Sequence, residues 1–255
     1  MAILFASDFD GTLYFHGADE PIRTADLKAI RAFQEEGGLF GACTGRPVRA
    51  LTVQTEGIIP FDFYIALTGG TVFDRSLQPI YHRELPRELV RELFERFSPL
   101  ARDGIALVCA EEDYWMVGGA QTDEFPIRLA STFDDLPDPV QGMGMETETI
   151  EIAEQLAAEV NATYGDDVCS YVNLASIDIL PAGCSKGTGL QRAAEYFGAT
   201  LTGGIGDSLN DLPLLEAADV AYTFRRCDPS MHAQANVLVD HVSEALEDFL
   251  AHPRV

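Results

Sequence analysis

The sequence has 255 residues, 47% of them hydrophobic, and a mean hydropathy of +0.02, which excludes a disordered chain and allows one large domain or one domain with an insert. We expect two units. The formal net charge of −24 comes from 41 acidic and 17 basic residues, so we expect no nucleic-acid or membrane partner, although local cations, backbone N–H groups or a metal can still bind a small anion.

The first elements follow a strand–helix–strand order. Residues 3–6 form a short apolar run that ends in Ser7-Asp8, as is typical of a buried parallel strand with polar residues at its carboxyl end. Thr24 is expected to cap a helix that stops at the glycine pair 37–38. A second apolar run, residues 39–43, predicts another strand.

The middle of the chain has a different pattern. Pro86 is expected to open a helix that reaches Phe97, and residues 105–109 and 114–117 resemble a hairpin. A second helix, with Ile152 on its apolar face, precedes strands at 168–174 and 176–180. Strands next to strands predict an α+β insert with an antiparallel sheet, in which residues 131–138 are a solvated loop.

The last quarter returns to alternating strands and helices. A helix over residues 185–197 is followed by a strand at 200–205, a helix at 212–217 and a strand at 220–223. Such alternation predicts an α/β fold with a Rossmann-like, doubly wound parallel sheet, whose ligand sites lie outside the carboxyl ends of the strands. Three polar clusters should therefore meet at one edge.

The segment Asp8-Phe9-Asp10-Gly11-Thr12 brings two carboxylates close together after a strand. One carboxylate can attack phosphorus, while the other can protonate the leaving oxygen and later activate water. An acidic turn or a calcium loop is the alternative, but the twelfth position of an EF-hand loop counted from Asp8 is Asp19 instead of Glu. The preceding strand also argues against calcium.

Two further clusters are weak signals when each is taken alone. Thr44-Gly45-Arg46 follows a predicted strand, where a hydroxyl and backbone N–H groups can bind phosphoryl oxygens. Lys186 stands at a predicted helix start, where it could hold a phosphate beside an anionic nucleophile. An ordinary turn and a solvated surface lysine are the alternatives.

The segment 206–211, Gly-Asp-Ser-Leu-Asn-Asp, is a stronger signal. Asp207 and Asp211 lie four residues apart at a strand-to-helix junction and can share one face. Carboxylate oxygens of this kind suit Mg²⁺, which prefers a few carboxylates, waters and a substrate oxygen. Helix capping by Asp207 or Ser208 is the structural alternative.

In this order the four clusters resemble the motifs of the haloacid dehalogenase superfamily. The resemblance covers the core, about residues 1–80 and 184–255, and the insert is similar to the cap of the Cof-type sugar phosphatases. Sucrose-phosphate phosphatases and phosphomannomutases are also similar. The resemblance implies a core formed by residues 1–81 and 184–255, with an α+β cap at 82–183.

The resemblance also implies a role for each motif residue. Asp8 is the implied nucleophile and Asp10 the general acid and base. The implied remaining residues are the phosphate holders Thr44 and Lys186, the phosphate or substrate contacts Gly11, Gly45, Arg46 and Asn210, and the Mg²⁺ ligands Asp8, Asp10 through its carbonyl, Asp207 and Asp211.

The chain departs from the Cof pattern in two places. Residues 67–70 read Leu-Thr-Gly-Gly where many relatives have Asn-Gly-Ala, and residues 221–226 read Ala-Tyr-Thr-Phe-Arg-Arg in place of a Gly- and Asn-rich run. Arg225 and Arg226 are interpreted as exposed charge in preference to an anion contact. Trp115 and Tyr114 are interpreted as core in preference to a sugar pocket.

We therefore expect a Mg²⁺-dependent phosphatase that hydrolyses a small phosphorylated metabolite, a sugar phosphate by resemblance, through an aspartyl-phosphate. A phosphomutase on the same core and a non-catalytic phosphometabolite-binding protein are the alternatives. Five scattered cysteines without a Cys-x-x-Cys pair indicate reduced thiols. The amino-terminal apolar run is too short for a signal peptide, so a cytoplasmic location is expected.

Overall fold

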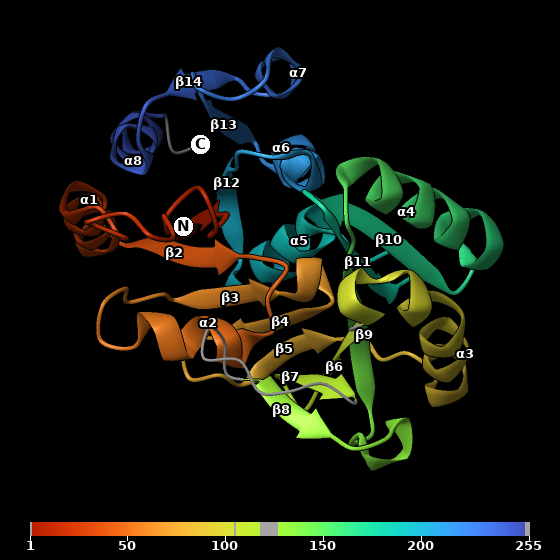
Figure 1. The fold of residues 1–255 in the computed structure, drawn as a ribbon. Helices are drawn as coiled ribbons and strands as arrows, with labels where there is room; N and C mark the ends of the chain where they lie inside the picture. Colours follow the sequence, from red (N-terminus) through yellow and green to blue (C-terminus); the bar gives the residue numbers. More distant parts are fainter. Residues whose placement is uncertain (1, 105, 118–126, 253–255) are drawn as a thin grey trace. The chain divides into compact units, whose positions relative to one another are not determined.

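The computed structural model describes residues 2–104, 106–117 and 127–252 (Figure 1). The chain divides into two compact units. The first unit comprises the residues up to Thr44, Thr55–Tyr81 and the residues from Ser185 onward, and the second comprises Gly45–Gln54 and His82–Cys184. Residues 45–54, which the sequence assigned to the core, thus group with the insert.

The helices and strands are labelled in chain order. The helices are α1 Thr24–Glu35, α2 Val48–Thr55, α3 Arg87–Phe97, α4 Ile150–Tyr164, α5 Lys186–Phe197, α6 Leu212–Ala217, α7 Pro229–His232 and α8 Val242–Ala251. The strands are β1 Ala2–Ser7, β2 Gly38–Cys43, β3 Phe63–Ala66, β4 Thr71–Asp74, β5 Pro79–His82, β6 Ala106–Ala110, β7 Asp113–Val117, β8 Ile127–Ala130, β9 Val140–Glu146, β10 Val168–Asn173, β11 Ser176–Pro181, β12 Ala199–Ile205, β13 Val220–Phe224 and β14 Val237–Val239.

A doubly wound sheet organises the first unit, as the alternation of strands and helices predicted. Its strand order is β14-β13-β12-β1-β2-β3-β4-β5, and the pairs from β14 to β3 are parallel. β4 then runs antiparallel to β3. The central strand β1 is buried along almost its whole length, because its side chains are covered on both faces of the sheet.

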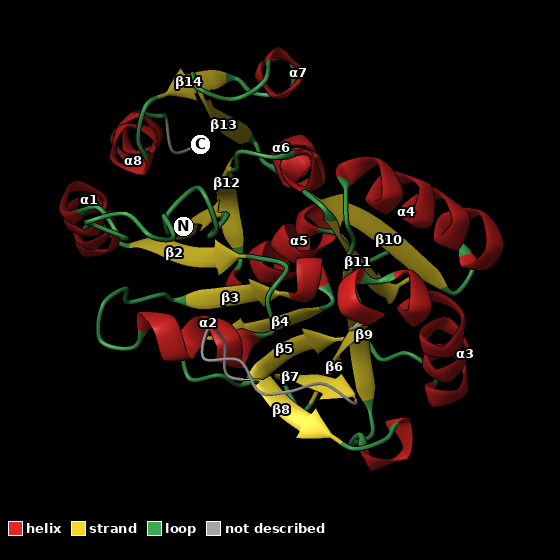
Figure 2. Ribbon diagram, viewed as in Figure 1, coloured by secondary structure: helices red, strands yellow, loops and turns green. Residues whose placement is uncertain are grey.

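Helices cover both faces of this sheet (Figure 2). α1 and α8 pack against each other on one face, and α5 and α6 do so on the other. Phe5, Phe33 and Phe249 meet beneath the first pair, with ring centroids 5.3–6.3 Å apart. Leu4, Leu190 and Leu214 belong to the core beneath the second pair. The two layers bury the apolar sides of both helix pairs.

The second unit has its own sheet and core. The strand order is β10-β11-β9-β6-β7-β8, with antiparallel pairing except between β7 and β8, which are parallel. α4 packs on β10 and β11, and α3 packs on β9. Trp115, interpreted as core, is partly buried against this core and donates its indole N–H to the Ala110 carbonyl at 3.2 Å.

Two local predictions need correction, and a third is not tested. Thr24 lies inside α1, whose N-cap residue is Arg23, and the Thr24 hydroxyl bonds to Glu20. Ile152 was expected on the apolar face of its helix, but its side chain is 38% exposed. Ile105, expected in the hairpin, lies outside the described residues.

The segment 131–138 is also wrong as a solvated loop. It contains a short 3₁₀ turn, Phe133–Asp135, whose Phe133 side chain is buried in the core of the second unit together with Leu136. Arg87 and Arg91 stack on the Phe133 ring, with guanidinium carbons 5.3 and 4.6 Å from its centroid. The acidic residues around two apolar anchors concealed this packing in the sequence.

No helix among residues 2–104, 106–117 and 127–252 has both the length and the apolar character needed to span a membrane.

Candidate active site

The carboxyl ends of three adjacent strands lie at the same edge of the first unit's sheet. Ser7, the last residue of β1, pairs with Ile205 of β12 and with Ala42 of β2. The Asp8 N–H then donates to the Ile205 carbonyl at 2.9 Å, so the pairing extends one residue beyond the strand. The loops that carry Asp8, Thr44 and Asp207 therefore start side by side, as the sequence predicted.

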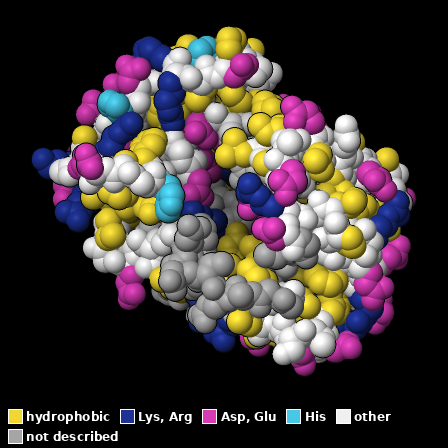
Figure 3. Space-filling view, in the orientation of Figure 1, with side chains coloured by type: hydrophobic (Ala, Val, Ile, Leu, Met, Phe, Trp, Pro, Cys, Tyr) yellow, Lys and Arg dark blue, Asp and Glu magenta, His cyan; other side chains and the backbone are white. Residues whose placement is uncertain are grey.

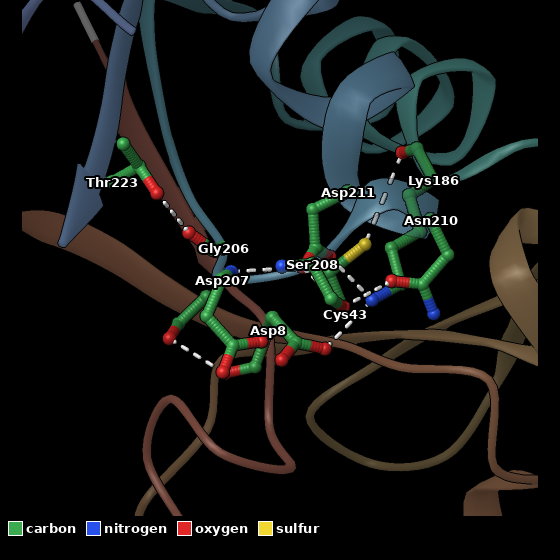
Figure 4. Close-up of polar contacts among 10 residues, drawn as sticks. Asp8, Cys43, Lys186, Gly206, Asp207, Ser208, Asn210, Asp211 and Thr223 are labelled. Carbon is green, nitrogen blue, oxygen red and sulfur yellow. Dashed lines mark hydrogen bonds and ion pairs between the residues drawn. The ribbon is translucent and has the colours of Figure 1, made fainter. Parts of the chain in front are cut away.

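A buried cluster forms where these loops meet the start of α5 (Figure 4). The Lys186 ammonium lies 2.6 Å from Asp8 Oδ1 and 2.5 Å from Asp211 Oδ1. All three side chains are nearly inaccessible to solvent. Ser185 caps α5 by accepting the Thr188 N–H, and this fixes Lys186 as the first helical residue.

Burial and mutual repulsion set the protonation of this cluster. Burial and the neighbouring Asp211 raise the pKa of Asp8 well above its usual value, and Lys186 opposes this rise. Burial lowers the pKa of Lys186, but the Asp211 and Asp8 carboxylates outweigh it and leave that pKa well above its usual value. Lys186 is therefore a permanent cation between two acids.

Asp211 shapes the loop that follows β12. Its Oδ2 accepts the backbone N–H groups of Asp207 at 3.0 Å and Ser208 at 3.1 Å, while its Oδ1 binds Lys186. The Thr223 hydroxyl on β13 donates to the Gly206 carbonyl at 2.8 Å. These bonds hold Asp207 at the mouth of the loop, where it is partly exposed.

Three carboxylates are close enough to share a cation. One oxygen each from Asp8, Asp207 and Asp211 lies within 4.8 Å of the others. Lys186 supplies one positive charge to this set and Arg226, 3.6 Å from Asp207 Oδ2, a second, so the three acids exceed the two cations by one charge when ionised. Burial raises the pKa of Asp207 and the neighbouring Asp211 raises it further, while Arg226 and Lys186 lower it. Hard oxygen ligands with this excess fit Mg²⁺.

Gly11 turns the chain that carries Asp10 back toward Asp207. Its φ of +77° favours glycine, and a Cβ atom there would lie 2.5 Å from Asp207 Oδ2. The Asp10 side chain is exposed, and its backbone bridges to Tyr14. The turn thus places the second carboxylate of the motif outside the buried cluster, accessible to solvent.

Thr44 is buried at the end of β2. Its N–H donates to the Ile65 carbonyl at 2.8 Å, and its own carbonyl accepts the Thr68 N–H at 2.9 Å. Thr68 has a φ of +48°, which is rare for a β-branched residue, and its buried hydroxyl has no described hydrogen-bond partner. The segment 67–70, where the chain departs from the Cof pattern, therefore has a strained backbone and holds Thr44 through a backbone hydrogen bond.

The remaining predicted site residues occupy separate positions. Gly45 and Arg46 belong to the second unit, and the Arg46 guanidinium donates to Gln54 at 2.6 Å. Asn210 is buried, and its side-chain oxygen accepts the Ser208 hydroxyl at 2.7 Å. The structure thus brings Asp8, Lys186, Asp207 and Asp211 together in one cluster. The other predicted site residues lie outside it, on neighbouring loops or in the second unit.

Arg226 was interpreted as exposed charge; its side chain is indeed 43% exposed, but it also contacts two loops of the cluster. Its guanidinium donates to the Gly11 carbonyl and lies 3.6 Å from Asp207 Oδ2. The neighbouring Arg225 does behave as surface charge, 55% exposed and paired with Asp240 and Glu244. The position of Arg226 two residues after β13, at the edge where the motifs meet, was the available signal.

One face of the molecule carries charged side chains of both signs. Acidic side chains are spread over the face shown in Figure 3, and Lys or Arg side chains lie between them. The cation at the cluster, Lys186, is buried and adds nothing to this surface.

Comparison with known proteins agrees with this geometry. The family of haloacid dehalogenase-like hydrolases matches residues 5–249. The HMP-PP phosphatase of Klebsiella pneumoniae (strain 342) is 24% identical over 267 residues, covering 99% of this chain and 96% of the relative. A second HMP-PP phosphatase, from Yersinia pseudotuberculosis serotype O:3 (strain YPIII), is 26% identical over 231 residues, covering 83% of this chain and 80% of the relative.

Solved structures share the fold at low identity. The HAD subclass IIB sugar phosphatase BT4131 has a TM-score of 0.78 and 21% identity, covering 97% of this chain and 98% of that protein. A haloacid dehalogenase-like hydrolase from B. subtilis has a TM-score of 0.83 and 17% identity, covering 96% and 98%. The family match spans nearly the whole sequence, and its relatives are phosphatases. The chain belongs to the family of haloacid dehalogenase-like hydrolases and is an enzyme of the phosphatase type.

Proposed function

We propose that this phosphatase requires Mg²⁺ and hydrolyses a small phosphorylated metabolite through a phosphoryl group carried on Asp8. One observation supports this most directly: a buried aspartate at a strand end contacts a buried lysine, and a third and a fourth charged group, Asp211 and Asp207, lie within reach. A carboxylate in such a setting can act as a nucleophile toward an anion only where cations offset the repulsion.

The proposed reaction has two steps. In the first, an Asp8 oxygen forms a bond to phosphorus as the bond from phosphorus to the ester oxygen breaks, and Asp10 gives its proton to that oxygen. In the second, Asp10 takes a proton from water, whose oxygen attacks phosphorus and releases inorganic phosphate and free Asp8. The first step leaves Asp10 deprotonated and therefore able to act as the base of the second step, which returns its proton for the next turnover.

The chain's own groups prepare Asp8 for this role. Lys186 touches Asp8 and would also attract the incoming phosphoryl oxygens, while Thr44, Gly45 and Asn210 are proposed to donate hydrogen bonds to them. Asp8, the Asp10 carbonyl and Asp207 are the proposed Mg²⁺ ligands. Asp211, also expected as a ligand, lies in the same group of carboxylates, but both of its oxygens already accept described hydrogen bonds. The cation would supply charge neutralisation for the transferred group.

A sugar phosphate is the proposed substrate class. The fold is shared with a sugar phosphatase, whereas relatives of similar length are HMP-PP phosphatases. Both kinds of substrate present a terminal phosphoryl group, so the Asp8 chemistry does not discriminate between them. Release of phosphate from a panel that contains sugar phosphates and HMP-PP would identify the class.

Substitution of the two aspartates tests the mechanism. Asp8→Asn should remove activity by several orders of magnitude, because an amide does not form the acyl-phosphate. Asp10→Asn should slow both steps by about 10²–10⁴-fold. With an activated aryl phosphate, whose leaving group needs little protonation, the Asp10 variant should accumulate phosphoenzyme, detected as a phosphate-sized mass increase on the peptide that contains Asp8.

Two results would contradict the mechanism: near-normal turnover by the Asp8→Asn variant, or a phosphate label on another residue. Phosphate returned to a second hydroxyl of the substrate, with none released, would instead indicate a mutase. Binding of substrate with no reaction in the unsubstituted protein would indicate a binding protein.

We also propose that residues 82–183 form a cap that selects the substrate, because Asp8, Asp10, Lys186 and Asp207 all lie outside them. Exchange of this segment for the corresponding segment of the Klebsiella relative should transfer the preference among substrates and leave the Mg²⁺ requirement unchanged. A chimera that folds and keeps the original preference would argue against the cap as the selector.

A further inference from the structure

Arg226 contacts the candidate site but has no role in the proposed reaction steps. Its side chain leaves the end of β13, crosses the face of the Phe224 ring at 3.9 Å, and reaches Asp207 and the Gly11 carbonyl. These two partners lie on different loops, one after β12 and the other after β1. One guanidinium therefore links both acidic loops of the site.

The two oxygens of Asp207 have different surroundings. Oδ2 faces Arg226 and lies so close to Gly11 that a Cβ atom there would meet it at 2.5 Å, whereas Oδ1 is farther from that point, at 3.6 Å. A carboxylate held through one oxygen can present the other to a cation. Outer partners of this kind orient carboxylate ligands in metal sites.

We propose that Arg226 is a positioning residue for the divalent-cation site. It holds Asp207 through Oδ2 and anchors the carbonyl of Gly11, the residue that follows Asp10, so that the two loops keep the spacing that the cation requires. This inference rests on the proposed function, because it takes Asp207 and the Asp10 carbonyl as ligands. The planar fork of arginine suits the role, since it can address two acceptors at once.

A competing effect gives the opposite expectation. Arg226 is a cation beside a cation site, so electrostatic repulsion alone predicts that its removal tightens Mg²⁺ binding. Its side chain is 43% exposed, however, and solvent and salt screen the repulsion. Loss of the link between the loops acts directly on the ligand geometry, and we expect this effect to dominate.

The test is a titration of the metal-free protein with Mg²⁺ by calorimetry, independent of turnover. Arg226→Met keeps an unbranched side chain but removes the guanidinium, and with it both the link and the stacking on Phe224, and it should raise the Kd for Mg²⁺ by about tenfold, the lower end of the range for outer-shell partners. Arg226→Lys keeps the charge without the fork and should recover part of the affinity. At saturating Mg²⁺, kcat of both variants should stay within about threefold of the unsubstituted enzyme.

Arg225 provides the matched control. Arg225→Met removes a charge one residue away whose described partners, Asp240 and Glu244, lie outside the cluster, and it should leave the Kd for Mg²⁺ within about twofold. Asp207→Asn, which removes a proposed ligand, should abolish measurable binding. Melting temperatures of all variants separate an effect on the site from an effect on folding.

The outcomes separate this inference from the proposed function. If the unsubstituted protein binds no Mg²⁺, the proposed cofactor is wrong. If it binds Mg²⁺ and Arg226→Met binds equally or more tightly, Mg²⁺ remains the cofactor and the positioning role is wrong. A weaker affinity that Arg225→Met matches would show a general charge effect and would also overturn the positioning role.

Discussion

At the scale of single residues, burial changes the meaning of a side chain that the sequence alone leaves ambiguous. Lys28 and Lys186 are the lysines of the sequence. Lys28 is exposed on α1, as most lysines are, whereas the Lys186 side chain is 1% exposed and contacts two carboxylates. The position of Lys186 at a helix start suggested its role, but its contacts depend on Asp8 and Asp211, which are remote in the chain.

Lys186→Met should be strongly destabilising. Removal of one partner leaves buried carboxylates without their cation, which costs about 3–5 kcal/mol in comparable buried pairs. Lys28→Met, the matched control, should change the free energy of unfolding by less than about 0.5 kcal/mol. Denaturant titrations of both variants measure these costs, and equal effects from the two lysines would contradict the account of the cluster.

The stability of the Lys186→Met variant should also depend on pH more strongly than that of the unsubstituted protein. Burial and Asp211 already raise the pKa of Asp8 in the folded protein, and loss of Lys186 removes a group that lowers it. The folded state then binds more protons than the unfolded state, so stability should rise as the pH falls from 8 toward 5. If the stability of the variant stays constant over this pH range, the pKa of Asp8 is not raised in its folded state.

At the scale of elements, the sequence predicted the parts of the sheet that carry the motifs. Residues 3–6 form an apolar run and residues 200–205 contain two threonines and two glycines, yet both lead into an acidic loop and both form strands close to the predicted bounds. β9, by contrast, reads Val-Gln-Gly-Met-Gly-Met-Glu; it carries two glycines, as β12 does, but no motif follows it to mark its end. α8 has its apolar residues at helical spacing and could have been found.

The same limit applies to the candidate site. Asp8, Lys186, Asp207 and Asp211 could be predicted because each stands at a fixed offset from a strand end or a helix start. The contact of Arg226 with Gly11 joins residues more than 200 positions apart, and nothing local to either residue specifies it. Strand order had to be known before this arginine could be assigned to the site.

The segment 67–70 links two parts of the site through close packing. A Cβ atom on Gly69, whose φ is +87°, would lie 1.9 Å from the Ser185 carbonyl oxygen, directly before Lys186. Thr68 binds the Thr44 carbonyl from the same segment. The segment therefore contacts both a proposed phosphate holder and the start of the helix that bears the lysine.

Gly69→Ala should displace the start of α5. Gly17 is the matched control, because its φ of +72° imposes a similar backbone strain while no atom lies within 4 Å of a Cβ atom there. Gly17→Ala should cost about 1–2 kcal/mol for the left-handed conformation. Gly69→Ala should cost clearly more and should also lower kcat, as denaturation and steady-state kinetics would measure. If both variants lose the same free energy of unfolding and kcat is unchanged, the Ser185 backbone moves away from the added methyl group at little cost.

At the scale of the whole molecule, charge distribution matters more than any single pair. The formal net charge is −24, and salt screens its exposed acids. Asp8 and Asp211 are buried, so salt screens the repulsion between them much less. Monovalent salt should relieve repulsion over the surface. A divalent cation should relieve the repulsion inside the cluster as well, because it can bind three carboxylates at once.

Mg²⁺ should therefore stabilise the folded protein beyond the effect of ionic strength. For a site that exists only in the folded state, the gain is about 2.7 kcal/mol when free Mg²⁺ is a hundredfold above its Kd. Thermal unfolding in MgCl₂, compared with NaCl of equal ionic strength, measures the specific part. Asp207→Asn should remove that part and keep the response to NaCl, because the surface charge is almost unchanged. If Mg²⁺ and NaCl raise the melting temperature of the unsubstituted protein equally, the carboxylates do not form a cation site.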